Sequence, residues 1–196
     1  MVHADASNFA SGVHKEEAYN QILEQAEALF DGQRNWVCNL ANAASLLWHA
    51  YKALPSPSCH VNWAGFYVLD STTSDQLILG PFHGKVACQT IRFGRGVCGT
   101  AAETAKTQLV PDVEQFPSHI ACDGDSKSEI VVPIAQHGRV SVGLFPWWSC
   151  VDVDKTNQVV GIIDVDCAIL DGFDESDQAW LEKLSTLLAK SCDFGS

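Results

Sequence analysis

Basic side chains are scarce in this chain of 196 residues. Lysine and arginine number 12 against 24 aspartates and glutamates, which gives a formal net charge of −12. A nucleic-acid-binding groove needs clustered cations, and so does a surface that docks on anionic lipid. We therefore expect neither nucleic acid nor a membrane among the partners of this protein.

Long apolar runs are also missing. No stretch approaches the ~20 apolar residues of a membrane-spanning helix. Residues 1–13 have neither the positive segment nor the apolar segment of a secretory signal. We therefore expect a cytoplasmic protein, in a reducing compartment where its eight cysteines would not form a static disulfide framework.

The sequence contains no Cys-x-x-Cys pair, which argues against a zinc ribbon and against a thioredoxin-type motif. A zinc site would have to be assembled from residues with no standard ligand spacing. The available ligand types are His83, Cys88, Cys98, His119 and Cys122. We expect no metal and no cofactor.

Apolar periodicity predicts helices at both ends of the chain. Spacings of three and four predict one helix over 15–31 and a second over 34–53. Asp174 is placed to cap the N-terminus of a final helix. A short helix over 96–106 is a further candidate.

Between these helices the residue pattern favours strands. The expected strands cover 61–70, 76–79, 107–110, 129–135 and 159–165. Five glycines between 80 and 99 suggest a loop whose backbone comes close to another group. Helices flanking an antiparallel sheet give an α+β fold, and the length of the chain fits one domain.

Three cysteines lie in segments that do not read as ordinary core. Cys88 and Cys98 flank the Gly94-Arg95-Gly96 loop, and Cys122 sits in a polar loop that follows Pro117. A thiol on a polar loop can meet solvent and substrate, whereas a buried structural thiol is inert. Free cysteine is more often a small buried hydrophobe, so each of the three has both interpretations. The core interpretation suffices for Cys38, Cys150, Cys167 and Cys192.

Carboxylates form a second candidate feature. Asp164 and Asp166 are two residues apart, so a strand would place them on one face. If that face is buried, one pKa of the pair should rise, and a carboxyl that stays protonated can donate a proton. If the face is solvated, the two residues are ordinary surface groups. Glu129 begins another strand.

Two aromatic residues share a strand face in the same way. Trp63 and Tyr67 are four residues apart within Asn62-Trp63-Ala64-Gly65-Phe66-Tyr67. They would either line an apolar pocket or belong to the core, and spacing alone favours the core.

Taken together and in order, several motifs make the chain resemble the free methionine-R-sulfoxide reductases. The resemblance covers roughly residues 15–190, with one interruption. The matching segments are 62–67 (NWAGFY), 80–88 (GPFHGKVAC), 94–99 (GRGVCG), 110–113 (VPDV), 119–123 (HIACD) and 128–133 (SEIVVP).

This resemblance implies a single GAF domain over 15–192, after a flexible N-terminus over 1–14. The expected fold is a central antiparallel sheet of about six strands flanked by N- and C-terminal helices. The implied activity is reduction of free L-methionine-(R)-S-oxide to L-methionine. In the family's chemistry Cys122 is the nucleophile and becomes a sulfenic acid, Cys88 resolves it as a disulfide, and a thioredoxin-type reductant restores both thiols. Cys98 matches a third cysteine that would relay or substitute in recycling.

The remaining site residues also come from the resemblance. The acidic pocket residues are Glu129, Asp164 and Asp166, and the wall that holds the substrate methyl group is Trp63 and Tyr67. Backbone N–H groups around Ile120 and Ala121 are suited to bind the substrate carboxylate. Because peptide-bound methionine lacks both charges of the free amino acid, such a pocket should reject it.

The chain departs from the family pattern over residues 141–160, where we expect an inserted hairpin extension. Ser141–Leu144 imitates Val159–Ile162 but lacks the aspartates that follow, so we assign the functional strand to 159–166. Trp147 and Trp148 would form a contact surface or pack on their own subunit. A homodimer is a separate candidate for the assembly of this protein. Cys150 in this insert has no assigned role.

A non-catalytic GAF module that binds a small ligand or senses redox state is the alternative function. The fold cannot separate a sensor from an enzyme. The three cysteines at matched positions favour the enzyme.

Overall fold

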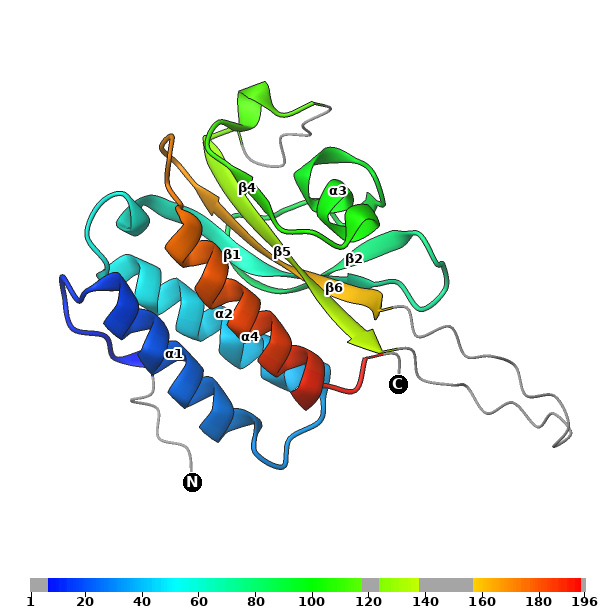
Figure 1. Cartoon of the computed structure of the whole chain (residues 1–196), viewed down its shortest axis with the longest axis horizontal. Coiled ribbons are helices and arrows are strands. Elements are labelled where there is room, and N and C mark those ends of the chain that lie inside the picture. Colours follow the sequence, from blue (N-terminus) through cyan, green and yellow to red (C-terminus); the bar gives the residue numbers. More distant parts are fainter. Residues whose placement is uncertain (1–6, 118–123, 138–156, 195–196) are drawn as a thin grey trace, which may run out of the picture.

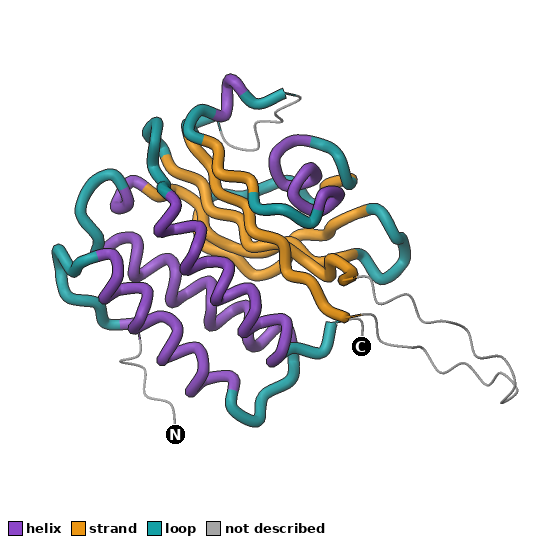
Figure 2. Tube along the Cα trace, viewed as in Figure 1, coloured by secondary structure: helices purple, strands orange, loops and turns teal. Residues whose placement is uncertain are grey.

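A six-stranded antiparallel sheet forms the centre of the computed structural model, which describes residues 7–117, 124–137 and 157–194 (Figure 1). The strand order is β3-β2-β1-β6-β5-β4, and every neighbouring pair is antiparallel. Helices lie on both sides of this sheet (Figure 2). The strands are β1 (Val61–Leu69), β2 (Gln76–Gly84), β3 (Thr90–Arg92), β4 (Gln108–Val110), β5 (Ser128–His137) and β6 (Asn157–Cys167).

Three helices cover one face of the sheet. They are α1 (Lys15–Phe30), α2 (Trp36–Ala53) and α4 (Glu175–Ser191), and α1 packs against the other two. Asp174 caps α4 by accepting hydrogen bonds from the backbone N–H groups of Ser176 and Asp177, as the sequence predicted. The opposite face carries the short helix α3 (Gly96–Thr104), which contacts β3, β4, β5 and β6.

The two faces of the sheet are filled by alternate residues of the same strands, because successive side chains on a strand point to opposite sides. On β6, Ile163 and Val165 belong to the core under the helices, whereas Ile162 belongs to the core under α3. On β1 the corresponding members are Phe66 on the helix side and Tyr67 on the α3 side. This alternation decides which side chains reach the site.

The glycine-rich segment 80–99, expected as a loop, is partly regular structure, so the loop prediction was wrong for that part. The expected close approach of the backbone is confirmed, because a Cβ at Gly99 would lie 2.3 Å from the carbonyl oxygen of Arg92. Strand β2 continues to Gly84, and β3 follows at Thr90–Arg92. A β-bulge between Gly65 and Tyr67 of β1 absorbs one extra residue of β2. Pro81 lies within this bulge and pairs with no residue of β1, and β3 pairs only with Gln76–Ile78 of β2, so the missing N–H of Pro81 costs no pairing between strands.

Of the two similar segments, 159–162 lies in the sheet, whereas 141–144 falls outside the described residues. Strand β6 covers the assigned functional strand 159–166 and lies between β1 and β5. Most of the expected hairpin insert, with Trp147, Trp148 and Cys150, falls outside the described residues. Within the described ranges, no helix is both long and apolar enough to cross a lipid bilayer.

Candidate active site

Five side chains named from the sequence meet on the α3 side of the sheet. The strand register places Asp166 of β6 between Trp63 of β1 and Glu129 of β5. Two residues earlier on β6, Asp164 pairs with Gly65 of β1 on one side and Val131 of β5 on the other. The pairing of β6 with both neighbours therefore gathers the acidic residues beside the aromatic ones.

These side chains line a cavity of about 280 Å³ between the sheet, α3 and the segment that joins β2 to β3. Its lining includes the two aromatic residues, the three carboxylates and two of the candidate cysteines. Those members are Trp63, Tyr67, Glu129, Asp164, Asp166, Cys88 and Cys98. A concave and mostly apolar space of this kind is the usual form of a small-molecule site.

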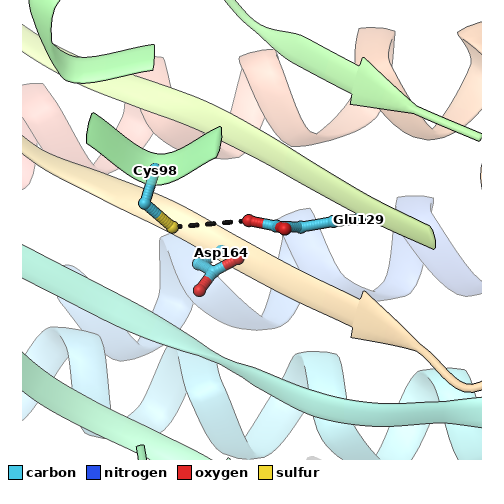
Figure 3. A group of neighbouring side chains, drawn as sticks. All are labelled: Cys98, Glu129 and Asp164. Atoms are coloured by element: carbon cyan, nitrogen blue, oxygen red, sulfur yellow. Dashed lines mark hydrogen bonds between the residues drawn. The ribbon is translucent and has the colours of Figure 1, made fainter. Parts of the chain in front are cut away.

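A cluster of one thiol and two carboxylates lies at the inner wall of this cavity (Figure 3). Cys98 comes from the first turn of α3, Glu129 from β5 and Asp164 from β6. The Sγ of Cys98 donates a hydrogen bond to Oε1 of Glu129 over 3.5 Å. The exposed fractions are 7% for Cys98 and 6% for each carboxylate, so the solvated-face interpretation of Asp164 is excluded.

Burial changes the acidity of this cluster. Loss of water raises the pKa of Asp164 to about 7. Burial also raises the pKa of Glu129 well above its usual range, and the negative charges of Asp164 and Asp166 raise it further. Since both carboxyls resist ionisation, at least one proton is available in the cavity near neutral pH.

The Cys98 thiol is held in its protonated form. Burial raises its pKa well above the usual value, and the nearby carboxylates of Asp164, Glu129 and Asp166 add to the shift. A thiol is nucleophilic only as a thiolate. Cys98 is therefore a hydrogen-bond donor in this state and not an activated nucleophile.

The aromatic wall is stacked and tied to the β2–β3 segment. The Trp63 ring stacks on Phe82 at 5.2 Å and on Tyr67 at 5.9 Å between ring centroids. This stack requires Gly65, because a Cβ at that position would lie 2.3 Å from Cβ of Phe82. Tyr67 donates its hydroxyl proton to the backbone carbonyl of Cys88 over 3.1 Å.

Comparison with known proteins identifies the family. A model of the GAF domain matches residues 14–192. The free methionine-R-sulfoxide reductase of Saccharomyces cerevisiae is 52% identical over 192 residues, which are 98% of this chain and 95% of the relative. The chain belongs to the free methionine-R-sulfoxide reductase family.

Solved structures agree with this family and its GAF fold. A GAF-domain structure with 52% identity superposes with a TM-score of 0.85, over 99% of this chain and 98% of the other. The free methionine-R-sulfoxide reductase of Neisseria meningitidis, solved in complex with its substrate, is 37% identical. Its TM-score is 0.74, and the match covers 93% of both chains. The predicted α+β GAF fold with a six-stranded sheet is confirmed.

The cysteines expected from the family are only partly in view. Cys88 is disulfide-bonded. The other five cysteines of the described ranges, Cys38, Cys59, Cys98, Cys167 and Cys192, are free. The core interpretation holds for Cys167 and Cys192, which are buried, and was wrong for Cys38, which is exposed. Cys122, Ile120 and Ala121 lie outside the described residues.

Several lining residues were not singled out from the sequence. Arg92 and Arg95 reach the cavity, and so does Ser126, whose Oγ accepts a hydrogen bond from the side chain of Asn62 over 3.1 Å. The Gly94-Arg95-Gly96 motif carried a signal for Arg95, because a loop flanked by two candidate cysteines should face the same space. Ser126 had no such signal, since the contact that accompanies its place in the cavity, with Asn62, joins residues 64 apart in the sequence.

Proposed function

We infer that this protein reduces free L-methionine-(R)-S-oxide to L-methionine with a cysteine nucleophile and a carboxyl proton donor. The observation that carries the inference is the cavity in which buried carboxyls with raised pKa values face an aromatic wall, with disulfide-bonded Cys88 in its lining. Family membership supplies the substrate class. Reduction of a sulfoxide needs a nucleophilic thiol and a proton donor in the same cavity.

The chemistry follows from the polarity of the S=O bond. The sulfur is electrophilic and the oxygen is basic, so attack by a thiolate succeeds only if the oxygen is protonated as it leaves sulfur. We assign the attack to Cys122 and the proton to the carboxyl pair of Glu129 and Asp164. The burial of both groups and the raised pKa of each support this assignment.

The attack forms a bond between the Cys122 sulfur and the substrate sulfur, and this bond breaks as the protonated oxygen moves from the substrate sulfur to the cysteine sulfur. The net products are methionine, which leaves as a thioether, and the sulfenic acid of Cys122. The Cys88 thiol then attacks the sulfenic sulfur, which forms a disulfide and releases water. The disulfide of Cys88 and the freedom of the other described cysteines are consistent with this pairing. A thioredoxin-type dithiol in the cytoplasm would restore both thiols and leave as a disulfide.

Cys98 supports this chemistry from the inner wall. Its thiol donates to Glu129, and its raised pKa keeps it protonated. We therefore propose that Cys98 orients the Glu129 carboxylate in the resting enzyme. A contribution of Cys98 to recycling would require a rearrangement that removes it from the two carboxylates.

Selection of the free amino acid follows from charge. An ionised carboxylate among Glu129, Asp164 and Asp166 can pair with the substrate ammonium, whereas the aromatic pair Trp63 and Tyr67 would hold the apolar methyl group. Backbone N–H groups near Ile120 and Ala121 would bind the substrate carboxylate. N-acetylated or peptide-bound methionine sulfoxide has no ammonium group. Its binding would therefore leave a carboxylate of the protein buried in the cavity without a partner, which is costly in free energy.

Turnover with defined substrates tests this function. We expect methionine to form from L-methionine-(R)-S-oxide and a dithiol reductant, with negligible turnover of the N-acetyl compound. Cys122→Ser should reduce the rate to background, whereas Cys38→Ser, which alters an exposed free thiol, should leave it unchanged. Binding of the sulfoxide without turnover in the intact protein would favour the non-catalytic GAF module instead.

A further inference from the structure

We propose that the buried cluster of Cys98, Glu129 and Asp164 binds a thiophilic divalent cation such as Zn²⁺ when no substrate fills the cavity. Each residue offers one ligand atom, and the three atoms lie within 4.8 Å of one another. The ligands come from α3, β5 and β6, so no spacing along the sequence reveals them. This site differs from the zinc set weighed from the sequence, with which it shares only Cys98.

The donor types and spacing suit zinc. A thiolate and two carboxylates are ordinary Zn²⁺ ligands, with Zn–S near 2.3 Å and Zn–O near 2.0–2.2 Å, which places sulfur and oxygen about 3.5 Å apart in a tetrahedron. The Sγ of Cys98 and Oε1 of Glu129 are 3.5 Å apart. Three protein ligands leave a fourth position, which faces the cavity and has room for water.

An unpaired buried oxygen gives independent support. Oδ1 of Asp164 is buried and has no hydrogen-bond partner among the described residues. The side chain is only 6% exposed, so water does not easily satisfy this atom. Figure 3 shows Asp164 lying beside the sulfur of Cys98 and the carboxyl group of Glu129, which is where a shared ion would sit.

Charge explains why a cation competes with protons here. Three anions at this depth cannot coexist without compensation, and in the resting protein protons supply it. A bound divalent cation replaces those protons, because a coordinating thiol is deprotonated. The ion would release protons and leave the cluster with one net negative charge. If the proposed reductase function holds, the ion also blocks the substrate.

Cadmium is a suitable probe because its bond to a thiolate has an ultraviolet charge-transfer absorption. The full-length protein, with Cys88 kept in its disulfide, is titrated with Cd²⁺ alone and, in parallel calorimetry, with Zn²⁺ alone. We expect one cation per chain with a cadmium–thiolate band. Cys98→Ser should abolish the band, and Asp164→Asn should weaken affinity by at least about tenfold. Cys38→Ser is the matched control and should keep both signals.

Thermal melting of each variant establishes that it is folded. A cadmium–thiolate band that persists in folded Cys98→Ser, or an affinity that is the same in Asp164→Asn as in the parent, overturns the proposal. The outcome does not depend on the proposed activity. Cation binding by a protein without reductase activity would contradict the proposed function and support the metal site. Reductase activity in a protein that gives no cadmium–thiolate band would support the proposed function and contradict the metal site.

Discussion

On the face of the sheet that α2 and α4 cover, β1, β5 and β6 present a run of apolar side chains such as Phe66, Ile130 and Ile163. On the α3 face, alternate positions of the same strands include three carboxylates and two stacked aromatic rings. Burial stabilises the first face, because apolar surface leaves water. Burial of Glu129 and Asp164 opposes folding, because these carboxyls lose water and gain only weak partners in return, such as the Cys98 thiol. Because successive residues of a strand point to opposite faces, the same strands place the residues that stabilise the fold on one face and the residues proposed for the reaction on the other.

The largest expected effect tests the cavity face. Asp164→Asn keeps the shape of the side chain but removes its transferable proton, so kcat for L-methionine-(R)-S-oxide should fall by ~10²–10⁴-fold, the usual contribution of general acid catalysis. Steady-state kinetics measures it. Asp75→Asn alters an exposed carboxylate and should leave kcat unchanged. Unchanged kcat in Asp164→Asn would remove this carboxyl from the reaction.

The next effect tests the helix-covered face. Ile163 is fully buried on β6, one residue before Asp164, and points to the opposite side. Ile163→Ala should lower the free energy of unfolding by about 2–5 kcal/mol and leave kcat per folded molecule unchanged. Urea unfolding and kinetics on the same sample measure both. Ile78→Ala, at a position 43% exposed, is the control and should cost about 0.5 kcal/mol or less. A large loss of kcat in folded Ile163→Ala would mean that the two faces are coupled.

A pH effect on stability sharpens the comparison. Burial raises the pKa of Asp164 from its ordinary 3.8 to about 7, so between these values the folded state holds a proton that the unfolded chain has lost. The free energy of unfolding due to this group is therefore greatest below pH 4, falls as pH rises towards 7 and levels off above it. Asp164→Asn lacks this loss, so its stability relative to the parent should improve by a few kcal/mol between pH 4 and pH 8.

Urea unfolding of both proteins at several pH values measures this difference. Comparison with the parent cancels the titration of buried groups outside the cluster of Cys98, Glu129 and Asp164, such as Asp177, whose pKa is also raised by burial. A stability difference that does not change with pH would show that Asp164 ionises in the fold as readily as it does in the unfolded chain.

The smallest expected effect concerns the aromatic wall. Trp63→Phe keeps a ring but loses the hydrogen bond from Nε1 to the carbonyl of Lys85 and part of the stack on Phe82. KM should rise about threefold to tenfold with kcat nearly constant, since such contacts contribute about 1 kcal/mol. Trp36→Phe, in a stack outside the cavity, is the control. A fall in kcat with constant KM would give Trp63 a role in the chemical step.

Much of the fold could be predicted from the sequence because its signals are local. The apolar stripes of α1, α2 and α4, the cap at Asp174 and the alternation on β6 all depend on residues close together in the chain. The segment 80–99 could not, because glycine and proline usually mark loops. Here β1 supplies the partner that holds Gly80–Gly84 in a strand, and that pairing is not local.

The site was predictable only in part for the same reason. A spacing of two predicted that Asp164 and Asp166 share a face, but their burial depends on α3 and the β2–β3 segment, which cover that face unequally. Asp164 is 6% exposed, whereas Asp166 is half-buried. The contact between Cys98 and Glu129 joins residues 31 apart in the sequence, so it had no local signal.

Single-turnover mass spectrometry tests the central claim most directly. The reduced protein is mixed with one equivalent of L-methionine-(R)-S-oxide, free thiols are blocked at once with an alkylating reagent, and the peptides are sequenced. We expect one methionine formed per chain, with Cys88 joined to Cys122 and Cys98 alkylated only after unfolding. Methionine formation with Cys122 still free, or with Cys98 in the disulfide in place of Cys88, would contradict it.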